Sequence, residues 1–146
     1  AEWSRKNNLG FGLMTNGTKS KVLRRLLRLQ LLDFVAVDIK TIPEIKAYAK
    51  ITQNKRIGLG QIKETVALLK NSGIQYEFRT TLVPQIVYRP EEIRQISDWV
   101  GIDHFVLQIF RPTETVLDPA LRQAAFNEEE LSSIREVGKQ LGIHIR

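Results

Sequence analysis

The sequence contains no cysteine among its 146 residues, so it can form no disulfide and supply no thiolate to zinc or to an iron–sulfur cluster. No apolar run approaches the roughly 20 residues that cross a bilayer. The first residues, Ala1 to Trp3, lack the apolar core of a signal peptide. Internal repeats and low-complexity segments are absent as well. We therefore expect one domain over residues 1–146, located in the cytoplasm and without a membrane partner.

Acidic residues are fewer than basic ones, 16 against 22, which gives a net charge of +6 and an isoelectric point near 9.8. Such a balance suits a polyanionic partner. Much of the excess lies on one expected helix, at Lys19, Lys21, Arg24, Arg25 and Arg28. A solvated helix face explains this run better, because the chain lacks the interleaved aromatic and basic residues that stack on nucleic acid. A nucleic-acid partner is therefore disfavoured.

Two periodicities alternate from one end of the chain to the other. Short apolar runs predict strands, and apolar residues at helical spacing, opened by residues such as Thr18 and Pro90, predict the helices between them. The expected strands cover residues 11–14, 34–40, 76–83 and 104–110. One expected helix follows Thr18, and three others cover residues 61–72, 90–100 and 127–141. Helical crossovers require parallel strands, so the predicted fold is α/β with parallel β/α repeats.

The stretch Thr41 to Gly60 is polar, and we expect a long connection there with one helical turn around residues 44–49. Gly58 and Gly60 precede a helix without following a strand, so a flexible loop explains them better than a phosphate-binding loop.

Polar residues occupy alternate positions in two of the expected strands. Val35 to Lys40 is V-A-V-D-I-K and Tyr76 to Thr81 is Y-E-F-R-T-T, which puts Asp38, Lys40, Glu77 and Arg79 on one face. A buried parallel sheet should be apolar on both faces, and desolvating several charges is costly. The set therefore indicates a binding site at the carboxyl ends of the strands, where β/α barrels hold their substrates.

Each of these residues has a structural alternative. Asp38 with Lys40, or Glu77 with Arg79, can form an ion pair that does no more than neutralise a desolvated charge. His104 lies at the start of its strand, away from the expected site, and no histidine is placed to complete a nucleophilic triad. We predict no catalytic residue and no metal ligand in this chain.

Four motifs carry a family resemblance: Thr15 to Thr18 (TNGT), Asp33 to Lys40 (DFVAVDIK), Phe78 to Pro84 (FRTTLVP) and Leu107 to Pro112 (LQIFRP), with Leu117-Asp118-Pro119 beyond them. In order and spacing they resemble the C-terminal part of radical SAM activating enzymes. The similarity is greatest to the activating proteins of anaerobic ribonucleotide reductase and more distant to pyruvate formate-lyase activating enzyme.

The resemblance implies a partial TIM-like (βα)6 barrel that binds S-adenosylmethionine and cleaves it reductively with a [4Fe-4S] cluster. The 5′-deoxyadenosyl radical so formed takes a hydrogen atom from a glycine of a partner enzyme, such as anaerobic ribonucleotide reductase. The resemblance also implies that residues 1–146 form an incomplete barrel, from its third to its sixth strand. The cofactor-binding residues it implies are Thr15, Asn16, Asp38, Lys40, Arg79, Gln108 and Arg111.

The chain departs from the family pattern in three places. The CxxxCxxC loop and the Gly-Gly-Glu segment are missing, and Met14 stands where an acidic residue commonly precedes Thr-Asn-Gly. The cluster would therefore belong only to a longer form, and we expect this chain alone to be inactive. A truncated protein, a proteolytic core and one product of a split gene all fit.

Two further expectations follow. The missing strands would leave one edge of the strand at residues 11–14 exposed, which predicts self-association or pairing with a complementary half barrel. The alternative function is a catalytically inactive α/β module that binds a nucleotide or a protein.

Overall fold

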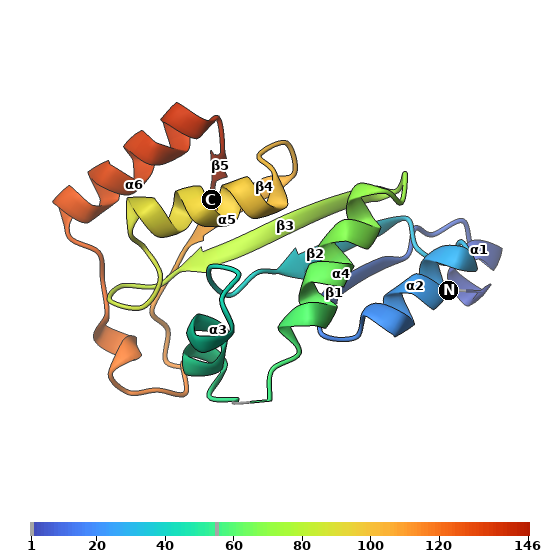
Figure 1. Cartoon of the computed structure of the whole chain (residues 1–146), viewed down its shortest axis with the longest axis horizontal. Coiled ribbons are helices and arrows are strands. Elements are labelled where there is room, and N and C mark those ends of the chain that lie inside the picture. The colour runs from blue at the N-terminus through green and yellow to red at the C-terminus, as the bar shows by residue number, and fades with distance from the viewer. Residues whose placement is uncertain (1, 55) are drawn as a thin grey trace.

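The computed structural model describes residues 2–54 and 56–146, and within them five parallel strands form one sheet in the order β1-β2-β3-β4-β5 (Figure 1). The strands are β1 (Gly12–Thr15), β2 (Phe34–Asp38), β3 (Gln75–Leu82), β4 (Phe105–Ile109) and β5 (His144–Ile145). Every neighbouring pair is parallel. The predicted α/β fold with a parallel sheet is confirmed.

One helix precedes the first strand, and the others fill the connections between the strands. They are α1 (Glu2–Lys6), α2 (Ser20–Arg28), α3 (Ile45–Thr52), α4 (Leu59–Lys70), α5 (Pro90–Val100) and α6 (Glu128–Leu141), with a 3-10 turn at Leu121–Gln123. Pro90 opens α5, as expected. Asn127 caps α6 by accepting the N–H of Glu130 at 2.8 Å, and Gly142 ends that helix in the left-handed region. No helix in the described ranges is long and apolar enough to cross a membrane.

The helices α2 to α6, which follow the first strand, cover the same face of the sheet. Strands that are parallel and adjacent in chain order are joined by right-handed crossovers, and these place successive helices on one side. The core lies on that side, where Val35, Val37, Phe78, Leu82 and Leu107 are fully buried. Helices α2 and α4 pack together there, as do α5 and α6. The opposite side, which we call the open face, carries the polar set of alternate residues.

Four local details differ from expectation. The helical turn expected around residues 44–49 is present but longer, as the eight-residue helix α3, and Leu59 and Gly60 form the first turn of α4 rather than a flexible loop. Lys19, not Thr18, precedes the first turn of α2, because the Thr18 hydroxyl is bonded to Asn16. The fifth strand, β5, was not foreseen.

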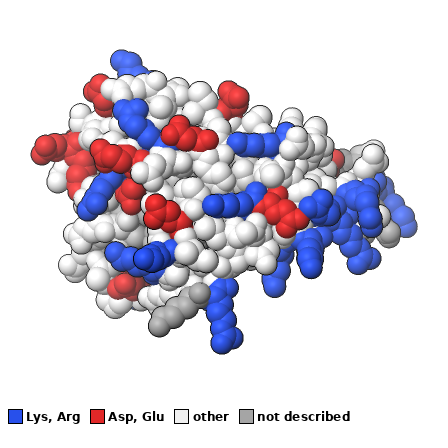
Figure 2. Space-filling view, viewed as in Figure 1, with Lys and Arg blue, Asp and Glu red and all other residues white. Residues whose placement is uncertain are grey.

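Charge is distributed unevenly over the molecule. Figure 2 shows Lys and Arg side chains gathered at one tapered end, the end at which Figure 1 places α1 and α2. Red and blue side chains alternate over the rest of the face shown.

Candidate functional site

The open face brings polar side chains of neighbouring strands into register. Asp38 of β2 lies beside Arg79 of β3, and Thr81 of β3 lies beside Gln108 of β4. Because successive residues of a strand alternate between faces, Glu77 shares the face of Arg79. The sequence pattern therefore predicted this face correctly.

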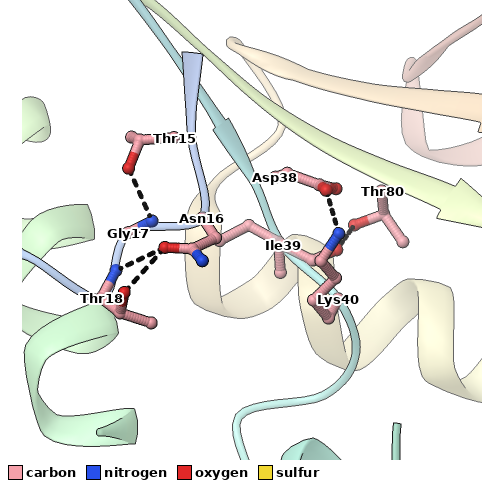
Figure 3. Close-up of polar contacts among 8 residues, drawn as sticks. All are labelled: Thr15, Asn16, Gly17, Thr18, Asp38, Ile39, Lys40 and Thr80. Carbon is pink, nitrogen blue, oxygen red and sulfur yellow. Dashed lines mark hydrogen bonds and ion pairs between the residues drawn. The ribbon is translucent and has the colours of Figure 1, made fainter. Parts of the chain in front are cut away.

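The turn that follows β1 is held by its own side chains (Figure 3). The N–H of Gly17 donates to Thr15 Oγ1 at 3.2 Å, and the N–H and hydroxyl of Thr18 donate to Asn16 Oδ1 at 3.2 and 2.8 Å. The buried hydroxyl of Thr65 on α4 donates to the carbonyl of Gly17 at 2.8 Å. These bonds fix Thr15 and Asn16 at the carboxyl end of β1, one strand away from Asp38.

Asp38 and Lys40 form an ion pair at the carboxyl end of β2 (Figure 3). Ile39, which lies between them, is anchored from the core side: its N–H donates to the carbonyl of Arg79 at 2.7 Å, and the buried Thr80 hydroxyl donates to its carbonyl at 2.9 Å. The backbone is thus fixed while both charged side chains stay 40% exposed. The pair can exchange with water and with a ligand.

Glu77 lies between two arginines on the open face. It forms an ion pair with Arg79 on its own strand and a second with Arg146, whose Nη2 is 3.0 Å from Glu77 Oε2. Only 15% of the Glu77 side chain and 19% of the Arg79 side chain are exposed. The group keeps one positive charge in excess, which favours an anionic ligand nearby. Sequence analysis missed Arg146, which extends from the unforeseen β5.

A buried tyrosine adds a polar atom close to the Asp38 end of the site. Tyr48 of α3 is 1% exposed, and its hydroxyl makes no hydrogen bond within residues 2–54 and 56–146. Burial is the largest cause that raises the pKa of Tyr48 above its ordinary value of 10.0, and the charge of Asp38 raises it further. The backbone at Lys40 and Thr41 opposes that rise. The phenol therefore stays protonated and can donate a hydrogen bond.

Gln108 and Arg111 lie apart from Asp38 and Lys40. They line a hollow of about 390 Å³ together with Thr81 and Arg146, and neither Asp38 nor Lys40 belongs to its lining. Gln108 lies within β4, whereas Arg111 follows the strand and is exposed. The seven predicted residues thus form two groups along one edge of the sheet, one at the ends of β1 and β2 and one at the end of β4, with Arg79 between them.

The charges on the open face are paired within the chain. This is what the alternative interpretation requires, in which the ion pairs only neutralise desolvated charges. An ion pair at this exposure is worth about 0–1 kcal/mol, so a ligand that carries both an anionic and a cationic group can replace Asp38 or Lys40 as partner at little cost. Glu77 and Arg79 are more enclosed and harder to separate. No group of three His, Cys, Asp or Glu residues that could hold a metal ion occurs in the described part of the chain.

Comparisons with known proteins agree with the fold. No model of a known protein family matches the chain. The chain is 25% identical, over 142 residues, to a protein of Methanocaldococcus jannaschii that carries the provisional name glycyl-radical enzyme activating enzyme. The match covers 96% of this chain but only 59% of the length of that relative.

Two solved structures share the architecture. A domain of pyruvate-formate lyase-activating enzyme from Bacteroides vulgatus superposes with a TM-score of 0.70 at 9% identity, covering 97% of this chain and 83% of that one. A radical SAM methyltransferase from Sphaerobacter thermophilus superposes with a TM-score of 0.69 at 14% identity, covering 96% of this chain and 41% of that one. The expected partial-barrel fold, with parallel β/α repeats, is confirmed.

Proposed function

We propose that this chain is the C-terminal portion of a radical SAM activating protein and that its open face binds S-adenosylmethionine. The observation that carries the proposal is the placement of Asp38, Lys40 and Arg79 at one end of the open face, which no helix covers within residues 2–54 and 56–146. The similarity to a relative named as a glycyl-radical enzyme activating enzyme supports it.

The donors present suit the polar groups of S-adenosylmethionine. The carboxylate of Asp38 can accept a hydrogen bond from an ammonium group or a ribose hydroxyl, and Lys40 or Arg79 can hold a carboxylate. Thr15, Asn16, Gln108 and Arg111 extend the proposed contacts along the same edge of the sheet.

A [4Fe-4S] cluster does not fit the residues of this chain. Such a cluster supplies the electron for cleavage of S-adenosylmethionine, and it needs cysteine thiolates that the sequence does not contain. We propose that residues 1–146 form one incomplete barrel domain, and that the ligands to the cluster come from another part of the protein or from a second chain. The protein that receives the radical would be a glycyl radical enzyme, such as anaerobic ribonucleotide reductase.

Calorimetry tests the cofactor. S-adenosylmethionine is titrated into the chain and compared with AMP, which keeps the adenosine but lacks the methionyl group. We expect the Asp38→Asn and Lys40→Met variants to bind S-adenosylmethionine about 10- to 100-fold more weakly, the usual effect of removing a charged partner. Asp98→Asn, an exposed position on α5, is the matched control and should bind as the wild type does.

Equal affinity for S-adenosylmethionine and AMP would contradict the proposal and favour the alternative, a catalytically inactive module that binds nucleotides. A second readout concerns activity. The purified chain, under anaerobic reducing conditions, should release no 5′-deoxyadenosine. Release by this chain alone would refute the proposal that the ligands to the cluster lie outside residues 1–146.

A further inference from the structure

The net positive charge of the protein comes from one short stretch. Residues 3–32 contain seven Lys or Arg and no Asp or Glu, whereas the remainder of the chain holds 15 basic and 16 acidic residues. This stretch forms α1, β1 and α2, and Figure 2 shows the resulting concentration of cations at one end of the molecule. The net charge of +6 is therefore a local feature and not a property of the whole surface.

Helix α2 presents a mixed stripe on its outward side. Its inward side contacts the core through Leu23, Leu26 and Leu27. Lys21, Arg25 and Arg28 follow one another at spacings of four and three, so they lie in a row on the outward side. All three are exposed, and none forms an ion pair with a described residue.

Two apolar side chains lie beside this row. Val22 and Leu29 are seven residues apart, which places them on the same side of the helix, and they are 55% and 50% exposed. Neither contributes to the core. Arginine is enriched at protein interfaces, and apolar side chains exposed beside it gain free energy when a partner buries them.

We propose that this stripe, formed by Lys21, Val22, Arg25, Arg28 and Leu29, is a docking surface for an acidic face of a partner protein. The cations complement carboxylates, and the two apolar side chains require apolar partners, which a phosphate backbone does not offer. A membrane surface fits less well, because the continuous apolar face of α2 is turned into its own core. The proposal goes beyond the cofactor site and does not depend on it, since α2 covers the opposite side of the sheet from Asp38.

Binding of defined probes to the 146-residue chain tests the surface. The probes are an acidic peptide of alternating Glu and Leu, poly-L-glutamate of equal charge, a DNA duplex of equal charge, and phosphatidylglycerol vesicles, measured at two salt concentrations. We expect the Glu-Leu peptide to bind most tightly. The triple variant Lys21→Glu, Arg25→Glu and Arg28→Glu should lose about tenfold of that affinity, the sum of three weak surface pairs.

Matched variants separate the effect of the charges in the stripe from the effect of the net charge of the protein on binding. Lys46→Glu, Lys63→Glu and Lys139→Glu change the net charge equally at exposed sites on other helices and should leave peptide affinity within about twofold. Val22→Ser with Leu29→Ser should weaken binding of the Glu-Leu peptide but not of DNA. Urea unfolding of each variant establishes that the fold is kept.

Tighter binding of DNA or vesicles than of the Glu-Leu peptide would overturn the proposal in favour of those partners. Equal loss in the two triple-reversal variants would overturn it as well, because binding would then follow net charge alone. Concentration-dependent self-association that the stripe variant abolishes would assign the surface to a second copy of this chain and likewise overturn it.

Discussion

Gly17 is the residue on which the polar turn after β1 depends. Its φ is +75°, and a Cβ at this position would lie 3.2 Å from Cγ1 of Val37, a fully buried side chain. Gly142, with φ at +70°, has open space around the same atom. Alanine at either position adopts a left-handed conformation that costs about 1–2 kcal/mol. Only at Gly17 must the core also move.

We therefore expect Gly17→Ala to lower the free energy of unfolding by about 2–3 kcal/mol and Gly142→Ala by about 1–2 kcal/mol. Urea unfolding of the two variants measures the difference. Because the turn also positions Thr15 and Asn16, Gly17→Ala should reduce ligand affinity as well, whereas Gly142→Ala should not. Equal losses of stability would mean that Val37 yields without cost and that the turn is less tightly packed than its contacts indicate.

At the same scale, the sequence predicted which face each polar side chain occupies, and its structural alternative named the Asp38–Lys40 and Glu77–Arg79 pairs that the structure shows, but it did not predict the second partner of Glu77. The face of Asp38 and Arg79 follows from the two-residue period of a strand, which is a local property. That second partner is Arg146, 69 residues further along the chain. Such a pairing depends on how the strands are assembled, and no local pattern contains it. The assignment of Thr15, Asn16, Gln108 and Arg111 to a cofactor came from family resemblance, and it stays a prediction.

Among the elements, α2 and α4 are joined by one carboxylate. The hydroxyl of Ser20 donates to Glu64 Oε2 at 2.6 Å, and Arg24 forms an ion pair with the other oxygen. The bond from Ser20, followed by that from Arg24, holds the pKa of Glu64 below its ordinary value of 4.5. A folded pKa below the unfolded one stabilises the fold above pH 4.5, and this contribution is lost as the pH falls through the folded pKa.

Glu64→Gln should accordingly lower the melting temperature at pH 7, and its difference from the wild type should shrink as the pH falls below 4.5. Thermal unfolding followed by circular dichroism between pH 7 and pH 3 provides the measurement. Glu114→Gln, which removes an exposed charge from a loop, is the control and should show no such convergence. A difference that stays constant over the whole pH range would contradict a role for the ionised carboxylate.

Elements with a long periodic pattern could be predicted, and short or mixed ones could not. Helices α4, α5 and α6 bury apolar residues at regular spacing, so their sequences indicate them directly. Helix α3 buries little more than Tyr48, and a single buried aromatic residue defines no period. Strand β5 has two residues, and it is held by the close approach of Ile145 to Gly138 on α6. Tertiary packing, rather than local propensity, forms both elements.

For the molecule as a whole, the two ends of the sheet differ in their capacity to pair. Strands β1 and β5 are the edge strands within the described residues, and β5 is too short to offer a long row of unpaired backbone groups. Strand β1 has four residues, and exposed apolar side chains accompany it: Leu9 is 52% and Met14 is 74% exposed. An edge of this kind is a template for another strand, either from a second copy or from a complementary half barrel.

We expect the 16.8 kDa chain to self-associate through β1, so that its weight-average mass in sedimentation equilibrium rises with concentration. Met14→Lys places a charge on the exposed side of the edge strand and should shift the chain toward the monomer without loss of stability, since lysine on an edge opposes pairing. Ile102→Lys, at an apolar residue 46% exposed beyond α5, is the control and should leave the association unchanged. A single 16.8 kDa species at every concentration would show that the β1 edge is protected in solution, and the half-barrel interpretation would then lose its main physical support.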